Sequence, residues 1–132
     1  MKRRFFFLVV PIFLILFSCH KSNDNNDNLS QGTWRVSLFT DSGTDETADF
    51  NGYSFTFGTG GVLTSSRGAI TQNGTWSRGS DFNIDLGPKA DNNKPLGQLT
   101  DDWKIISISS TEIKLTDDNS SSAEFLTFTK NP

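Results

Sequence analysis

Apolar and polar residues alternate with a period of two over most of the chain beyond residue 28. In the segment 32–40, for example, Trp34, Val36 and Leu38 would share one face of a strand, and Arg35 and Ser37 would share the other. The same pattern, with turn residues between the runs, predicts eight short strands, at residues 32–40, 53–57, 62–66, 70–77, 82–86, 103–109, 113–115 and 124–130. No part of this region has a sustained helical period, so we expect an all-β domain.

The connections between these strands are short, which favours pairing in chain order. Gly58–Gly61 and 79–80 are typical turn sequences, and the longest connection, Gly87–Gln98, contains Pro88 and Pro95. Antiparallel strands with one apolar face must close or stack to bury that face, and about eight strands can close a barrel. We therefore predict a small antiparallel up-and-down β-barrel of about eight strands, with a two-sheet sandwich as the alternative.

A different pattern marks the first 18 residues. The basic residues 2–4 precede an apolar run of 13 residues, Phe5–Phe17, whereas a membrane-spanning helix needs about 20. This layout is typical of a secretory signal. The end of the run, Leu16-Phe17-Ser18-Cys19, resembles the bacterial lipobox, which implies cleavage before Cys19 and its acylation with a diacylglyceryl group and palmitate-type chains. We predict that residues 1–18 are a lipoprotein signal peptide; the alternative is an ordinary secretory signal.

The stretch 20–28, which follows the predicted lipidation site, has no apolar residue. Such a segment cannot bury enough surface to become ordered, so residues 19–28 are predicted to be the lipidated N-terminus and a flexible tether. The residue after Cys19 is His20 rather than the aspartate that retains enterobacterial lipoproteins in the inner membrane. We therefore expect a lipid-anchored protein of the cell envelope, in the outer membrane, on its periplasmic face or at the cell surface.

Residues 29–132 carry short motifs in a characteristic order. Gly-x-Trp occurs at Gly32-Thr33-Trp34 and again at Gly74-Thr75-Trp76, and the later strands contain Trp103-Lys104-Ile105-Ile106, Glu112-Ile113-Lys114-Leu115 and Phe125-Leu126-Thr127-Phe128. This succession resembles the lipocalin-like domains of Bacteroidetes lipoproteins, in which the first tryptophan packs across one end of the barrel. The chain is shorter than typical lipocalins, has no C-terminal helix pattern, and has no arginine that clearly matches the one that covers this tryptophan.

The aromatic residues of the domain allow two interpretations. In the first, they line a cavity for a small hydrophobic ligand, as in lipocalins; the candidate ligand-binding residues are Trp34, Tyr53, Phe55, Trp76, Phe82 and Trp103. In the second, the same rings fill the core, because each buries about 150–250 Å² and a barrel of this size has little space to spare.

Residues 29–132 offer little for catalysis. They contain neither histidine nor cysteine, which excludes a Ser-His-Asp or Cys-His arrangement and the usual zinc sites. Three pairs of adjacent carboxylates, 45–46, 101–102 and 117–118, would point to opposite faces of a strand. The segment 91–93 consists of one aspartate and two asparagines, whose oxygens are of the kind that bind calcium, but it lacks the spacing of an EF-hand loop. We expect no catalytic residue, no metal and no cofactor, and hence no enzymatic activity.

Removal of the basic leader changes the formal charge from −3 to −6. An acidic domain is a poor partner for nucleic acid, which requires a basic surface. We expect a monomeric, membrane-anchored lipoprotein that binds or carries a small hydrophobic ligand. The alternative is a non-catalytic interaction module with a filled barrel, which binds a protein or a glycan through its loops Asp41–Asp49 and Gly87–Gln98.

Overall fold

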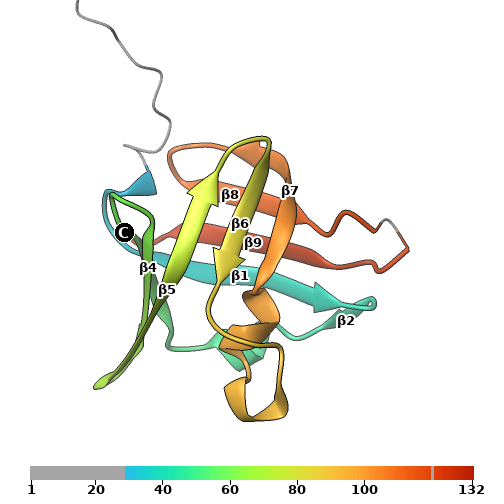
Figure 1. Ribbon diagram of the computed structural model, residues 1–132, viewed down its shortest axis with the longest axis horizontal. Coiled ribbons are helices and arrows are strands. Elements are labelled where there is room, and N and C mark those ends of the chain that lie inside the picture. The colour runs from blue at the N-terminus through green and yellow to red at the C-terminus, as the bar shows by residue number, and fades with distance from the viewer. Residues whose placement is uncertain (1–28, 120) are drawn as a thin grey trace, which may run out of the picture.

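The computed structural model describes residues 29–119 and 121–132 (Figure 1). The predicted signal peptide (1–18), the lipidation site Cys19 and the tether (19–28) lie outside the described residues. Within the described part of the chain, no helix has the length and apolar character that a membrane span requires.

Eight of the strands form one closed antiparallel barrel, which confirms the predicted fold class. Each strand pairs with the next in the chain, and the last strand pairs with the first, so the sheet closes on itself. The eight strands of the barrel are β1 (Trp34–Asp41), β3 (Ser54–Phe57), β4 (Val62–Arg67), β5 (Ile70–Arg78), β6 (Asp81–Asp85), β7 (Asp101–Ile108), β8 (Glu112–Thr116) and β9 (Phe125–Lys130).

A ninth strand, which the pattern did not predict, is the two-residue β2 (Thr44–Asp45), which forms a short hairpin with the end of β1. It lies where β1 and β3 diverge, since these two strands pair only at Trp34 and Phe55. The 3₁₀ turn η1 (Thr47–Phe50) closes this seam, because the Phe39 N–H donates to Thr47 Oγ1 at 2.9 Å and the ring of Phe50 packs on the ring of Phe39.

The predicted register of the first strand is wrong beyond Val36. The pairing of β1 with β9 shifts by one residue between Val36 and Leu38, as in a β-bulge. An extra residue turns the side chains that follow it to the opposite face. Leu38 is therefore 37% exposed, and Phe39 takes its place in the core.

The first described residues close one end of the barrel, which we call the N-terminal end. Leu29 is fully buried, and its carbonyl accepts a hydrogen bond of 3.0 Å from Trp34 Nε1. The ammonium group of Lys130, the last residue of β9, lies 5.0 Å from the centre of the Trp34 ring. Lys130 thus covers the ring of Trp34 at this end of the barrel. The C-terminus lies at this same end (Figure 1), where the Asn131 N–H donates to the carbonyl of Thr33.

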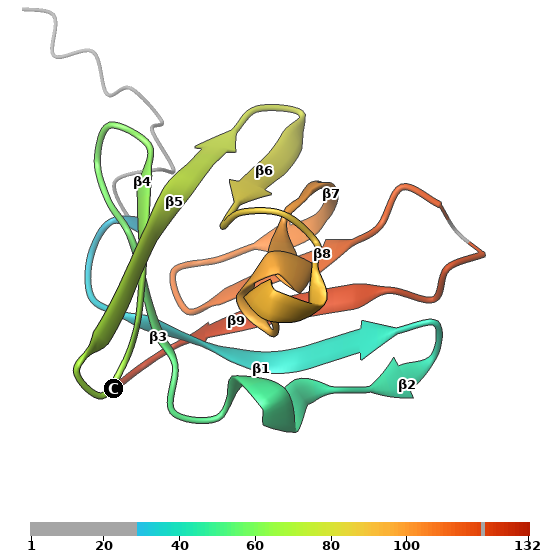
Figure 2. The ribbon, with the colours of Figure 1, turned by 60° about the horizontal axis from the view of Figure 1, so that its bottom comes forward.

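The connection from β6 to β7, residues 86–100, closes the opposite end. Two 3₁₀ turns, η2 (Asp91–Asn93) and η3 (Leu96–Leu99), lie across the barrel opening, as Figure 2 shows. Leu96 and Leu99 are buried, so they seal the core. We call this the loop end, because the β1–β2 hairpin and the β8–β9 connection also lie there.

Candidate functional site

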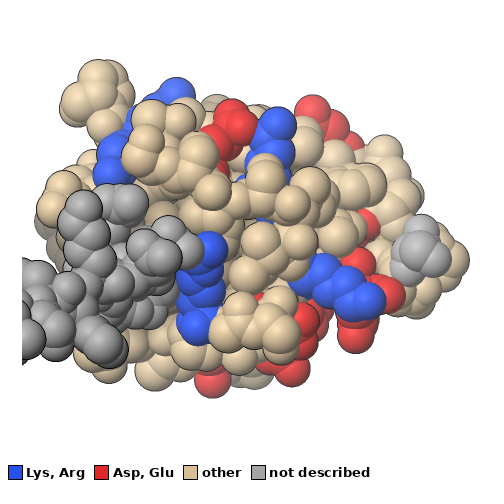
Figure 3. All heavy atoms as spheres, turned by 90° about the horizontal axis from the view of Figure 1, so that it is seen from above, with Lys and Arg blue, Asp and Glu red and all other residues tan. Residues whose placement is uncertain are grey.

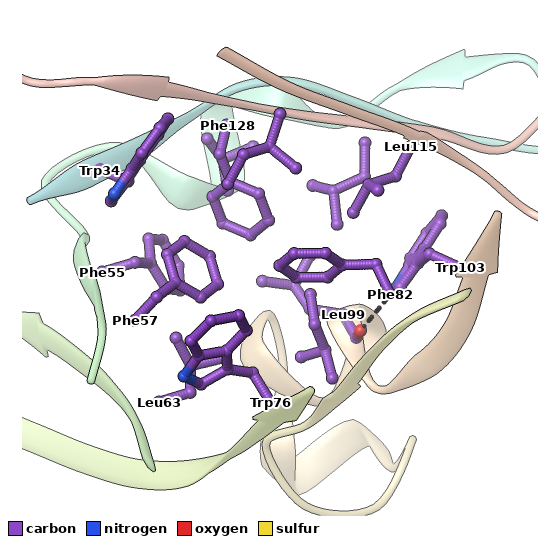
Figure 4. Close-up of a cluster of buried hydrophobic side chains, with 14 of the residues drawn as sticks. Trp34, Phe55, Phe57, Leu63, Trp76, Phe82, Leu99, Trp103, Leu115 and Phe128 are labelled. Atoms are coloured by element: carbon purple, nitrogen blue, oxygen red, sulfur yellow. Dashed lines mark hydrogen bonds between the residues drawn. The ribbon is translucent and has the colours of Figure 1, made fainter. Parts of the chain in front are cut away.

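The six residues proposed to line a ligand cavity all lie in or against one core cluster. Five of them are buried, and Tyr53 is partly buried at its edge, with the guanidinium of Arg67 4.6 Å from its ring centre. Figure 4 shows the labelled rings pointing into the barrel from different strands. The structure therefore gathers these residues in the interior, and whether they bind a ligand stays a prediction.

The rings of this cluster contact one another closely. The Phe57 ring lies 5.4 Å from Trp76, 5.6 Å from Phe82 and 5.3 Å from Phe128, centre to centre, in each case edge to face. The Phe55 ring lies 5.2 Å from Phe128 in the same geometry. Separations of about 4.5–7 Å are those of directly packed aromatic pairs. The aromatic side chains thus pack directly against one another in the interior of the barrel.

The indole N–H groups of the three tryptophans are all hydrogen-bonded within the protein. Each of the three donates to a main-chain carbonyl: Trp34 to Leu29 at 3.0 Å, Trp76 to Gly58 at 2.9 Å and Trp103 to Leu99 at 2.9 Å, the last drawn in Figure 4. A buried donor that is already paired has no bond left for a ligand. The tryptophans therefore hold the ends of the barrel in place.

One concave site lies at the loop end of the barrel. It is a cleft of about 330 Å³, which we call the loop-end cleft, lined by Phe39, Asp41, Lys89, Ala90, Asp91, Lys94, Gln98 and Glu124. The two loops of the interaction hypothesis meet here, and Gln98 Nε2 donates to Glu46 Oε2 at 3.1 Å between them. The alternative hypothesis assigned partner binding to both loops, and the structure brings them side by side.

Three carboxylates gather at the cleft, with a lysine beside them, and Glu124 and the lysine line the cleft directly. Oxygen atoms of Asp101, Asp117 and Glu124 lie within 4.8 Å of one another. The ammonium group of Lys89 forms an ion pair of 2.8 Å with Asp101 Oδ2. We call these four residues the carboxylate–lysine cluster. The positive charge of the lysine offsets part of the repulsion among the three carboxylates.

The cluster shifts the titration of two of its members. Burial, aided by the charges of Asp117, Asp41 and Asp101 and opposed by that of Lys89, raises the pKa of Glu124 to about 7. For Lys89, burial alone would lower the pKa, but the hydrogen bond and charge of Asp101, aided by Glu124 and Asp117, raise it above its ordinary value. Glu124 therefore changes charge near neutral pH, whereas Lys89 remains charged.

Pattern analysis missed this cluster because its members come from separate parts of the chain. Asp101 and Asp117 each belong to an adjacent pair of acids, but the structure combines one member of each pair with Glu124. The sequence contained one indication of the cluster. All three carboxylates lie at the ends of predicted strands, and in an up-and-down barrel these strand ends meet at the same end of the barrel. The segment 91–93, which the sequence offered as a weak calcium candidate, has a different arrangement. The side-chain amide of Asn93 donates to the carbonyls of Leu86 and Pro88, so it holds the turn together.

A second hollow lies on the outer wall of β5, β6 and β7. It measures about 390 Å³ and is more open than the cleft. Its lining includes Ser77 and Asn83, whose side chains bond to each other at 3.0 Å, and the exposed Asp102. Asp101 of the Lys89–Asp101 ion pair also lines this hollow. We take the loop-end cleft as the candidate site because it is the more enclosed of the two and Lys89 itself lines it.

The fold defines the class of protein: a small lipocalin-like barrel. No family model and no curated protein matches the sequence. Among solved structures, the chain is similar to a lipocalin-like protein from Bacteroides uniformis, with a TM-score of 0.58 and 20% identity over 79% of this chain and 99% of that one. It is also similar to a DUF4847 family protein from Bacteroides vulgatus, with a TM-score of 0.58 and 18% identity over 80% and 96%. These matches confirm the resemblance at the level of fold.

Proposed function

We propose that this protein is a non-enzymatic lipoprotein of the cell envelope, anchored through Cys19, that binds a protein or a glycan at the loop-end cleft. The observation that carries this proposal is the close packing of the aromatic rings in the core. Edge-to-face rings and paired indole groups favour the interaction module over the carrier of a hydrophobic ligand, which the sequence had suggested first. On this account, the barrel is a rigid support for its loops.

The direction of the chain supports this arrangement. Leu29 is hydrogen-bonded to Trp34 at the N-terminal end of the barrel, whereas the residues that line the cleft belong to the loop end. A tether of about ten residues reaches at most roughly 33–36 Å, so the proposed anchor holds the N-terminal end nearer the membrane and leaves the loop end free. Figure 3 looks down on the top of the molecule as it is drawn in Figure 1. Lys and Arg side chains are scattered over this upper surface, with Asp and Glu mostly toward its margins.

The anchoring part of the proposal predicts the behaviour of Cys19→Ala. Without the thiol no diacylglyceryl group can be attached, so we expect the protein to move from the membrane fraction to the soluble envelope fraction. Incorporation of labelled palmitate should be lost in the same variant. Cys19→Ala protein that stays in the membrane fraction would contradict anchoring through this residue.

Site-specific photocrosslinking in cells tests the recognition part. A photoreactive residue replaces Lys94, which lies at the rim of the cleft with 56% of its side chain exposed. The matched control replaces Lys114, which is 48% exposed on strand β8. We expect a discrete crosslinked product from position 94 and none from position 114. Equal products at both positions, or none at either, would rule out the cleft as the binding surface.

A further inference from the structure

The charged residues of the domain are distributed unevenly between the two ends of the barrel. The loop-end segments 41–49, 67–70, 85–102 and 117–124 contain eleven acidic and three basic residues. The remainder of residues 29–132, which includes the N-terminal end, contains two acidic and five basic residues. The domain is acidic as a whole, yet most of its positive charges lie away from the loop end.

Two arginines contribute charge at the N-terminal end that no carboxylate offsets. Arg35 lies beside Lys130, because Arg35 Nη1 donates to the carbonyl of Lys130 and to Asn131 Oδ1, both at 3.2 Å. Arg78 is the last residue of β5, and its buried Nη1 has no hydrogen-bond partner in the described part of the chain. Among the described residues neither arginine forms an ion pair, whereas both lysines that line the cleft are paired with an aspartate.

The two acidic residues of this half of the barrel lie next to lysines. Asp81 is opposite Lys104 in the register of β6 and β7, and Glu112 Oε1 lies 3.3 Å from Lys114 Nζ. These acids therefore offset the lysines and leave the charge of the arginines in excess. The β5–β6 and β7–β8 turns of this half lie at the top of Figure 1, and Figure 3 shows Lys and Arg side chains spread over that upper surface.

The predicted tether reaches the domain at the same end. Residues 19–28 lead from the proposed anchor to Leu29, whose carbonyl is bonded to the indole of Trp34. A flexible chain of about ten residues has a typical end-to-end distance of about 16–19 Å. The anchor therefore keeps the N-terminal end close to the lipid headgroups for much of the time.

We propose that the N-terminal end of the barrel docks on the anionic phosphate headgroups of the membrane that holds the anchor, with the acidic loop end turned away. A negative surface potential of about 30 mV favours each elementary positive charge about threefold. The potential falls off over a Debye length of about 8–10 Å, so it acts mainly on the end that faces the membrane. This inference rests on the anchoring through Cys19 in the proposed function and adds the surface that the domain contacts.

Photocrosslinking to lipid tests the proposal. The acylated protein, purified from cells, is placed in phosphatidylcholine vesicles with or without phosphatidylglycerol. A photoreactive residue replaces the exposed Ser110 in the β7–β8 turn, next to Thr111, whose carbonyl accepts a bond of 2.8 Å from the Lys130 N–H. The matched position is the exposed Asn92 at the loop end. We expect lipid adducts from position 110 in the anionic vesicles, fewer at high salt, and few from position 92 in either.

Two charge reversals make the result specific. Arg35→Glu changes the charge of the N-terminal end by two units, so the docked state, and with it the yield of adducts from position 110, should fall by up to about tenfold. Lys94→Glu makes the same change of charge at an exposed position of the loop end and should leave the yield unchanged. Equal yields from position 110 with and without phosphatidylglycerol, or an equal effect of the two reversals, would overturn the proposal.

The test separates docking from the proposed function. The mass of the purified protein shows whether Cys19 is acylated. If it is not, the anchoring part of the proposed function fails, and the same vesicles receive the protein coupled through Cys19 to a maleimide lipid, which still measures docking. No binding partner is present, so a failure of docking leaves the crosslinking test of the cleft unaffected.

Discussion

Replacing Trp34 by alanine is expected to lower the free energy of unfolding by about 3–5 kcal/mol. Trp34 is fully buried, and its ring lies 6.1 Å from that of Phe57, edge to face. The substitution removes this packing, the bond from Nε1 to the carbonyl of Leu29 and the surface beneath Lys130. It therefore damages both the core and the closure of the N-terminal end. Denaturant unfolding followed by circular dichroism measures the loss.

Trp34→Phe is the matched control. It keeps an aromatic ring in the core but leaves the buried carbonyl of Leu29 without its donor, which costs about 1–3 kcal/mol. We expect its loss of stability to be smaller than that of Trp34→Ala. If Trp34→Ala destabilised the protein by less than about 1 kcal/mol, Trp34 would not be a core residue and the described register of β1 would be wrong.

Replacing Phe57 by alanine is expected to cost about 3–5 kcal/mol and to create a ligand cavity that the wild type lacks. The Phe57 ring packs against Trp34, Trp76, Phe82 and Phe128, all from other strands. Its removal leaves an apolar space at the centre of the core. Buried apolar cavities of about 150 Å³ in proteins stay dry and bind benzene.

Thermal unfolding with and without benzene distinguishes an interior that contains an apolar cavity from one that is filled. A ligand that binds only the folded protein raises its melting temperature. We therefore expect benzene to stabilise Phe57→Ala and to leave the wild type unchanged. An equal increase for both proteins would show that the wild-type barrel already contains an apolar cavity, in conflict with a filled core.

The strands and their order could be predicted because both follow from local patterns. Period-two alternation and glycine-rich turns identified all eight strands of the barrel, and the short connections indicated chain-order pairing. Local patterns did not reveal the bulge between Val36 and Leu38, since a bulge depends on the partner strand β9. The contact between the Lys130 ammonium group and the Trp34 ring was missed for the same reason, because the two residues meet only when the barrel closes.

The site was harder to predict than the fold. An inward-facing aromatic residue has the same sequence pattern whether it lines a cavity or fills it, because only the packing of all the rings together decides the remaining space. The carboxylate–lysine cluster draws on Lys89, Asp101, Asp117 and Glu124, which the register of β6 to β9 brings together. Its identity therefore required the three-dimensional arrangement.

The central claim is that the barrel is filled and that recognition takes place outside it. Titration of the full chain in detergent with palmitate, retinol and protoporphyrin, followed by tryptophan fluorescence, tests this claim most directly, since Trp34, Trp76 and Trp103 all belong to the core cluster. We predict no saturable change with any of the three. Saturable quenching at one ligand per chain would contradict the claim and identify the barrel as the carrier of a hydrophobic molecule.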